Sequence, residues 1–321
     1  MSLWFRFLLV LVLPPALMLG AAGARAETVD IGYQRSSSLF ILLKRSGELE
    51  ARLAPLGYDV NWHEFTAGLL DALNAGSVDL NADVADAFAL FSQAANAPLT
   101  YYAREDRAPQ GQGVLVAKDA DIRLLSDLKG KRVAVSRGSG SHFLLLRALQ
   151  HVGLTDKDID IRYLPAPDGL AAFSQGDVDA ISIWDPFQSV LLRSGDVRSL
   201  TDHAPELAEY YRFYTATTAF AKAHPEVLQV VFDALVEQGK WVKSHPHEAA
   251  EILAPLWGNL PVKTVELANS HRSYRILPVD KSDLQEQQRI ADTYHELGII
   301  PESLKATDIG VWTPQADHER E

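Results

Sequence analysis

The sequence predicts an α/β protein with two lobes, each a mostly parallel sheet flanked by helices, and a ligand cleft between the lobes. Three observations support this prediction. Strand-like and helix-like segments alternate along the first two-thirds of the chain, three strand–helix units occur twice in the same order, and the remainder is almost entirely helical. The 321 residues are enough for two hydrophobic cores. The 47% hydrophobic and 22% charged positions are typical of a globular chain.

A secretory signal is expected at residues 1–26. An apolar run at 8–19 follows Arg6, and an Ala-Arg-Ala pattern at 24–26 suits signal peptidase, so cleavage is expected before Glu27. The alternative is a membrane anchor. The run is shorter than the about 20 residues that span a bilayer, however, and it contains two prolines. No later stretch approaches that length, so we expect a soluble protein of the periplasm.

Charge and cysteine content exclude several classes of protein. There are 42 acidic and 30 basic side chains, which give a net charge of −12. This chain therefore lacks the basic footprint of a nucleic-acid binder. It has no cysteine, which excludes disulfides, thiolate metal sites, cysteine nucleophiles and a lipid anchor through an N-terminal cysteine.

The first lobe begins as alternating strands and helices. We expect strands at 28–34, 59–65, 78–83 and 99–103, and helices at 39–56, 69–74 and 87–95, of which the first is amphipathic. This alternation is typical of a parallel sheet with helices on both faces.

The same units restart at residue 132. Strands are expected at 132–136, 160–164 and 178–183, and helices at 142–151, 170–174 and 187–193. In both 68–79 and 169–179 a glycine opens a short helix, a second glycine ends it, and a Val-Asp pair begins a strand. The repetition predicts two similar lobes.

The last third of the chain is expected to return to the first lobe. After a strand at 211–220, helices are expected at 227–242, 246–253, 262–270 and 281–297. So few strands cannot build a third sheet, so these helices must cover an existing one. The expected division is a signal at 1–26, a first-lobe segment at 27–110, the second lobe at 111–215 and a first-lobe return at 216–321. Crossings near 106–113 and 211–217 would form a hinge.

Ligands of open α/β sheets bind beyond the carboxyl ends of the strands. Gly-Ser-Gly-Ser-His at 138–142 joins a strand to a helix. Its glycines admit a ligand to the backbone, while the hydroxyls of Ser139 and Ser141 and the free N–H groups can bind an anion. Capping of the helix by the same serines is the alternative. The spacing fits neither a dinucleotide fingerprint nor a P-loop.

Other strand ends add candidate ligand-binding residues. Gln34 and residues 36–38 form the equivalent turn of the first lobe. Trp184 can offer an apolar wall and one N–H to a ligand, or pack in the core. Asp83 could bind a ligand ammonium if it faces the cleft, or cap the next helix. Asp185 precedes a proline and is interpreted as a helix N-cap.

The strand ends hold no nucleophile, base and orienting acid together. His63, His245 and His247 lack the i, i+4 spacing of a helical zinc pair. They are interpreted as solvated side chains, and neither a metal nor a cofactor is expected.

Several segments, in this order and spacing, resemble the aliphatic sulfonate-binding family of periplasmic proteins that serve ABC importers. They are 31–34, 62–68, 128–133, 138–142, 184–186 and 286–292, and the resemblance runs from about Val29 to Trp312. It implies a type II periplasmic-binding fold that traps its ligand between hinged lobes. It also implies an ABC permease and its ATPase subunit as partners of a protein that usually acts as a monomer.

The family resemblance implies that the first-turn donors and the Gly-Ser loop hold the sulfonate oxygens beside the strand-end tryptophan. With Gly68 and Asp83 from the strand ends, the predicted ligand-binding residues are Gln34, Ser37, Gly68, Asp83, Ser139, Gly140, Ser141, His142 and Trp184. Members usually have a proline and about two more residues after the glycine that is Gly68 here. Many also carry Thr-Gly-Glu where this chain has Asp-Val-Ala at 83–85.

Two alternatives to a sulfonate-binding protein remain at this point. The ligand could be another small anion, such as taurine, nitrate or bicarbonate. The chain could also be an enzyme, because pyrimidine-synthesising relatives share the fold and His142 could serve as a base. Such an enzyme would need a cofactor site or an activated nucleophile, and the sequence offers neither.

Overall fold

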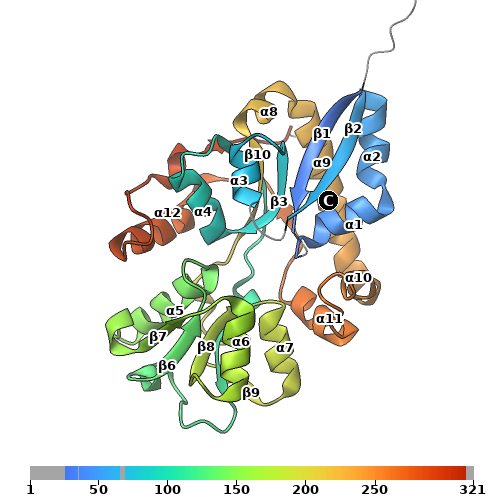
Figure 1. The fold of residues 1–321 in the computed structure, drawn as a ribbon. Coiled ribbons are helices and arrows are strands. Elements are labelled where there is room, and N and C mark those ends of the chain that lie inside the picture. The colour runs from blue at the N-terminus through green and yellow to red at the C-terminus, as the bar shows by residue number, and fades with distance from the viewer. Residues whose placement is uncertain (1–25, 35, 66–68, 316–321) are drawn as a thin grey trace, which may run out of the picture.

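The computed structural model describes residues 26–34, 36–65 and 69–315. They form two sheets, each flanked by helices, which lie one above the other in Figure 1. The predicted signal at 1–26 falls almost entirely outside the described residues, as does Gly68.

The first lobe is built on a seven-stranded sheet. Its strands are β1 (Glu27–Tyr33), β2 (Tyr58–Glu64), β3 (Leu80–Ala85), β4 (Leu99–Glu105), β10 (Arg212–Thr217), β11 (Ile276–Leu277) and β12 (Gly310–Val311). The order is β11-β4-β10-β3-β1-β2, and β12 pairs with β4. β1 is parallel to β2 and β3, whereas β10 is antiparallel to both β3 and β4.

The second lobe is built on a five-stranded sheet in the order β7-β6-β8-β5-β9. Its strands are β5 (Gln112–Ala117), β6 (Arg132–Val135), β7 (Asp160–Tyr163), β8 (Ala180–Trp184) and β9 (Val197–Ser199). β6 is parallel to β7 and β8, and β5 is antiparallel to β8 and β9.

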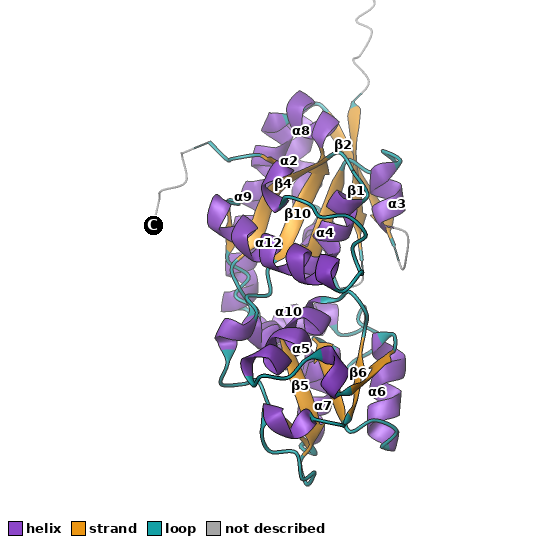
Figure 2. Ribbon diagram, turned by 90° about the vertical axis from the view of Figure 1, so that its left-hand side faces the viewer, coloured by secondary structure: helices purple, strands orange, loops and turns teal. Residues whose placement is uncertain are grey.

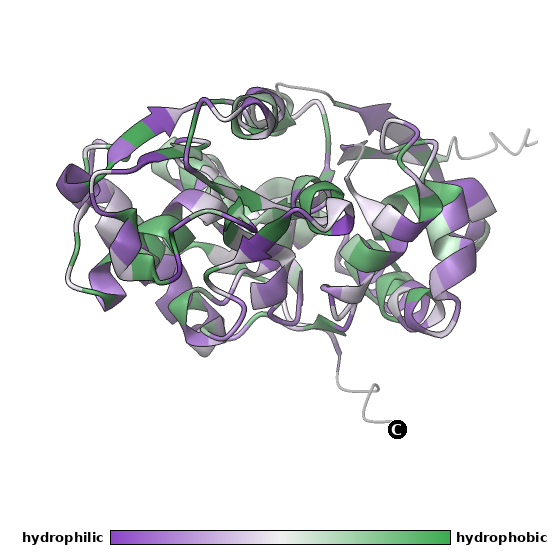
Figure 3. Ribbon diagram, turned by 90° about the horizontal axis from the view of Figure 1, so that it is seen from below, coloured by the Kyte–Doolittle hydropathy of each residue, from purple (hydrophilic) through white to green (hydrophobic). Residues whose placement is uncertain are grey.

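Helices cover both sheets. The second lobe carries α5 (Gly140–His151), α6 (Ala166–Gln175) and α7 (Phe187–Ser194). The other helices are α1 (Ser38–Ser46), α2 (Glu48–Leu53), α3 (Leu69–Asn74), α4 (Asp86–Ala94), α8 (Thr218–Ala223), α9 (Pro225–Ser244), α10 (Pro246–Leu253), α11 (Val262–Ser270) and α12 (Lys281–Glu296). Figure 2 shows the strands enclosed by helices in each lobe. In Figure 3 apolar and polar stretches lie side by side on the helices, as amphipathic packing requires.

The two-lobed α/β fold is as predicted, with differences in detail. Most strands of each sheet run in one direction, as predicted, but β5 in the second lobe and β10 and β11 in the first run against them. The helix predicted at 39–56 is broken at Gly47, whose φ of 69° ends α1. The strand predicted at 211–220 ends at Thr217, whose hydroxyl accepts a hydrogen bond from the Phe220 N–H and caps α8.

The chain passes between the sheets in two adjacent segments. Residues 106–111 lead from β4 to β5, and residues 200–211 lead from β9 to β10. The Ala108 N–H donates to the Glu209 carbonyl at 3.1 Å, so the two crossings run side by side. The return to the first lobe was predicted at residue 216, whereas the first sheet takes up the chain at Arg212. The domain limits otherwise stay a prediction.

α9 and α12 pack on the first lobe as predicted, whereas α11 packs on α7 of the second lobe as well as on α10. α9 packs on α1 and α2 of the first lobe, and α12 packs on α4. Tyr294 of α12 also reaches the second lobe, where its hydroxyl donates to the Ser139 carbonyl at 2.6 Å. An apolar cluster there joins Leu90 of α4 and Ile290 of α12 to Phe143 of α5. Helices α4 and α12 of the first lobe therefore contact the start of α5 in the second lobe.

Candidate functional site

A cavity of about 400 Å³ lies between the two lobes. Residues of both lobes and of the second crossing line it. They are Gln34, Ser36, Asp83, Val84, Ala85, Phe88, Phe91, Arg137, Gly138, Ser139, Gly140, Trp184, Tyr210 and Arg212. Three larger hollows, of about 540, 550 and 860 Å³, are each lined by first-lobe residues alone. The cavity between the lobes is therefore the candidate ligand site.

The predicted Gly-Ser loop begins α5 at the cavity wall. The Ser139 hydroxyl accepts from the His142 N–H at 3.2 Å and donates to the Ser136 carbonyl at 2.7 Å, so it caps the helix. Within the described residues the backbone N–H groups of Gly140 and Ser141 have no acceptor. Free N–H groups at a helix start attract an anion. Capping by Ser139 thus leaves two N–H groups of this loop free to bind an anion.

The predicted side chains of Ser141 and His142 do not line the cavity, because both are fully buried beneath it. The Ser141 hydroxyl lies 2.9 Å from that of Ser139. His142 Nδ1 accepts from the Gly138 N–H at 3.2 Å, and its ring stacks on Tyr294. Burial, with Arg137 nearby, lowers the pKa of His142 to about 4. His142 is thus a neutral core residue that supports the loop.

Two arginines that were not among the predicted residues face the cavity. Arg212, on β10, has only 9% of its surface exposed, and its Nε donates to Asp83 Oδ2 at 2.6 Å. Its terminal nitrogens have no partner within the described part of the chain. Arg137 is exposed and lies 5.6 Å from the Tyr163 ring, with no acidic partner among the described residues. The two guanidinium groups give the cavity an anion-binding character.

Asp83 lines the cavity, but its carboxylate is already occupied. Arg212 and Arg272 both contact its Oδ2, at 2.6 and 2.9 Å. Asp83 therefore does not cap α4, and two guanidinium groups already balance the charge that it could offer to a ligand ammonium. The residue at the start of α4 is Asp86, whose carboxylate accepts from the Ala87 and Tyr211 N–H groups. Burial raises the pKa of Asp86 to about 7, which reduces its charge near the cavity.

The first-lobe turn places some of its predicted residues at the cavity. Gln34 and Ser36 line it. Ser37 is buried, and its hydroxyl accepts from the Gln34 N–H at 3.1 Å, so it shapes the turn rather than the cavity surface. Gly68 cannot be placed, because it lies outside the described residues.

Aromatic side chains form the apolar part of the cavity wall. Phe88 and Phe91 come from α4, and Trp184 ends β8. Tyr210 lies at the second crossing with a φ of 56°, and its ring packs against Gly140 so closely that a Cβ there would lie 3.0 Å from it. Burial raises the pKa of Tyr210 to about 12, so its hydroxyl keeps its proton. The wall suits an apolar group next to an anionic head.

The remaining predicted groups lie elsewhere. Asp185 caps α7 from two residues before it, since its Oδ1 accepts from the Ser189 N–H at 3.0 Å. Its Oδ2 pairs with His271 Nδ1 at 2.6 Å. His63 pairs with Asp30 on neighbouring strands. Across the described residues, no group of three or more His, Cys, Asp or Glu side chains could hold a metal ion.

Comparisons relate this chain to known proteins over most of its length. The model of the NMT1-like family matches residues 41–257. A relative from Escherichia coli K12 that is named for binding aliphatic sulfonates is 38% identical over 299 residues, 92% of this chain and 91% of that protein. The crystal structure of a periplasmic aliphatic sulphonate-binding protein from Escherichia coli has a TM-score of 0.85 at 36% identity, covering 92% of this chain and 95% of that one.

Two further structures bear on the ligand and the fold. The alkanesulfonate-binding protein of Xanthomonas axonopodis pv. citri, bound to MOPS, has a TM-score of 0.78 at 34% identity and covers 90% of this chain and 99% of its own. A desulfurization enzyme has a TM-score of 0.66 at 17% identity, covering 88% of this chain and 96% of that one. The likeness to the enzyme shows the fold alone.

Proposed function

Since the chain belongs to the NMT1-like family, and is similar over most of its length to proteins that bind aliphatic sulfonates, we propose that it captures aliphatic sulfonates in the periplasm and delivers them to an ABC importer. The observation that carries this proposal is the cavity between the lobes. It combines two guanidinium groups, the free N–H groups at the start of α5 and an aromatic wall.

A sulfonate fits the polar half of the cavity because it stays ionised at every physiological pH. It needs hydrogen-bond donors and no proton acceptor, unlike hydrogen phosphate. Arg137 and Arg212 supply charged donors, and Asp83, the carboxylate among the lining residues, is already paired. The net charge of −12 does little to oppose anion capture, because charges farther than about 8 Å from the ligand are largely screened at physiological salt.

The composition supports a role in sulfur uptake. The sequence has no cysteine and two methionines, Met1 and Met18, both within the expected signal. After cleavage before Glu27 the protein would contain no sulfur. A chain of this kind can be made in quantity when the element it collects is scarce.

Localisation and partners follow from the same proposal. We infer export by the signal at 1–26, release as a soluble monomer without a lipid anchor, and docking to a permease with its ATPase subunit. No helix in the described part of the chain is long and apolar enough to cross a membrane.

An enzymatic role is not proposed. Two relatives from Escherichia coli that each match 92% of this chain are named as binding proteins. His142, the base that an enzyme would have used, is buried below the cavity and does not line it.

Isothermal titration with a panel of anions tests the proposed function. Ethane-, propane- and butane-1-sulfonate are expected to bind, and each added methylene should tighten binding about fourfold, since burying one is worth about 0.8 kcal/mol. Taurine should bind at least about tenfold more weakly than ethanesulfonate, because its ammonium would be desolvated near two guanidinium groups without a free carboxylate. Nitrate or bicarbonate binding in place of every sulfonate would contradict the proposal.

A further inference from the structure

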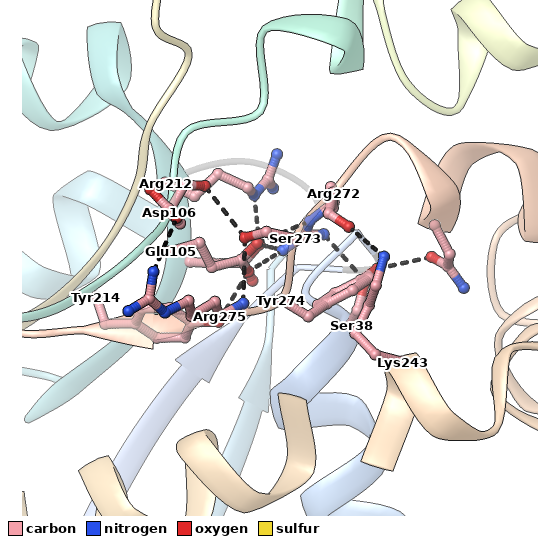
Figure 4. A network of polar contacts seen from close by, with 12 residues as sticks. Ser38, Glu105, Asp106, Arg212, Tyr214, Lys243, Arg272, Ser273, Tyr274 and Arg275 are labelled. Atoms are coloured by element: carbon pink, nitrogen blue, oxygen red, sulfur yellow. Dashed lines mark hydrogen bonds and ion pairs between the residues drawn. The ribbon is translucent and has the colours of Figure 1, made fainter. Parts of the chain in front are cut away.

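Arg272 lies behind the cavity, on the segment that joins α11 to β11. It is not among the lining residues, and its side chain is 6% exposed. It nevertheless contacts Asp83 near the end of β3. It also contacts Glu105 at the end of β4 and Ser38 at the start of α1 (Figure 4). One side chain thus connects three elements whose ends approach the ligand site.

The contact with Asp83 is shared with the arginine that faces the cavity. Arg212 Nε and Arg272 Nη2 lie 2.6 and 2.9 Å from the same oxygen, Asp83 Oδ2. The other oxygen, Oδ1, has no hydrogen-bond partner among the described residues. Asp83 therefore holds Arg212 by its Nε edge and leaves the terminal nitrogens of Arg212 for the cavity.

Arg272 is fixed from several sides. Its Nε donates to Glu105 Oε2 at 3.1 Å, and its Nη2 also contacts Glu105 Oε1. Its Nη1 donates to the Ser38 hydroxyl at 3.1 Å, and its guanidinium carbon lies 4.5 Å from the Tyr274 ring centroid. Lys243 Nζ donates to the Arg272 carbonyl at 2.8 Å, as Figure 4 shows. A guanidinium group held in this way can balance the negative charge of the carboxylates that it contacts.

The network balances two guanidinium groups against two carboxylates, but the carboxylates are not equivalent. Asp83 lines the cavity and Glu105 does not. With Arg212 as its sole partner, Asp83 would cancel the charge that Arg212 offers to an anion. We propose that Arg272 is a positioning residue of the anion site, which neutralises Asp83 so that Arg212 presents its charge to the ligand. This inference rests on the proposed sulfonate function.

The test is a comparison of two double variants that carry equal net charge. Arg272→Met alone should weaken butane-1-sulfonate binding by about 10- to 100-fold, because the network loses one positive charge and is left with a net negative charge close to the ligand. Adding Asp83→Asn removes that charge while the amide oxygen can still accept from Arg212 Nε, so affinity should return to within about threefold of wild type. Adding Glu105→Gln to Arg272→Met gives the same net charge but keeps the Asp83 carboxylate. The affinity should therefore stay at least about tenfold below that of the wild-type protein.

The affinity ratio of butane- to ethanesulfonate should stay constant, since no tail-contacting residue changes. Should Arg272→Met fail to fold, the two neutral double variants still give the comparison, with their melting temperatures measured alongside. Equal affinities for Asp83→Asn/Arg272→Met and Glu105→Gln/Arg272→Met would overturn the inference, as would wild-type affinity for Arg272→Met. Failure of the wild-type protein to bind any sulfonate would instead overturn the proposed function, and the inference with it.

Discussion

Replacing Arg212 by methionine is expected to lower the affinity for butane-1-sulfonate by at least about 30-fold. Truncating one partner of a buried, hydrogen-bonded charge pair costs about 2–5 kcal/mol of binding free energy. The change leaves Asp83 paired with Arg272, so no buried carboxylate loses its last ionic partner. Arg212→Lys should give an intermediate affinity, because an ammonium keeps the charge but loses the planar fork. Calorimetric titration measures both.

The chain offers a matched control in Arg104. Its Nε lies 2.6 Å from Asp283 Oδ2, the distance that also joins Arg212 Nε to Asp83, and both arginine side chains are 11% exposed. Arg104 is on β4, beside β10, but does not line the cavity. Arg104→Met should therefore lower the melting temperature without a matching loss of affinity. Equal losses of affinity for the two variants would place the anion away from Arg212.

Gly138→Ala is expected to weaken sulfonate binding by about 10- to 100-fold. Gly138 has a φ of +75°, and a Cβ at this position would lie 2.8 Å from Cζ of Phe91 on α4. Overpacking of this kind typically costs about 1–3 kcal/mol. Because Gly138 and Phe91 belong to opposite lobes, relief of the clash either separates the lobes or pushes the ring into the cavity. Both outcomes remove ligand contacts, and titration with butane-1-sulfonate measures the loss.

Gly153→Ala separates this effect from backbone strain. Gly153 has a φ of +74°, and a Cβ at this position would meet no heavy atom within 4 Å. Alanine there should cost about 1 kcal/mol of stability through the left-handed backbone alone. Its affinity should equal that of wild type. A Gly138→Ala protein that is only as destabilised as Gly153→Ala, with unchanged binding, would show that the lobes need not approach at this point.

Local signals in the sequence were enough to find part of the site. A turn that leads from a parallel strand into a helix lies at the carboxyl edge of the sheet, and this placement does not depend on distant parts of the chain. Gln34, Ser139, Gly140 and Trp184 were predicted in this way, and the structure brings them to one cavity. Whether they contact the ligand stays a prediction.

The two arginines were not among the predicted residues, and Arg212 is positioned by a contact between distant parts of the sequence. Arg212 meets Asp83 across 129 positions of sequence, on a strand whose residues were predicted to form a crossing. A charged side chain in the otherwise uncharged run at 212–217 was the signal that could have found it, since arginine is rarely buried without a partner. Arg137 directly precedes the Gly-Ser loop and could have been included with it.

The position of His142 below the cavity has a physical reason too. His142, Leu145 and Leu149 are spaced three and four apart and share the buried face of α5. This helical period, rather than nearness to the loop glycines, decides where the imidazole lies. The two-residue strands β11 and β12 were missed because two residues carry no detectable period.

The position of the ligand's sulfur atom tests the central claim most directly. The exported chain, beginning at Glu27, would contain no methionine or cysteine, so in sulfate-free crystals grown with butane-1-sulfonate the anomalous sulfur signal comes from the ligand alone. We expect one peak between the lobes, with the sulfonate oxygens within hydrogen-bond distance of the Gly140 and Ser141 N–H groups and of the Arg212 terminal nitrogens. A peak in the first-lobe hollow lined by Tyr33 and Lys44, or elsewhere outside the cavity between the lobes, would contradict the claim.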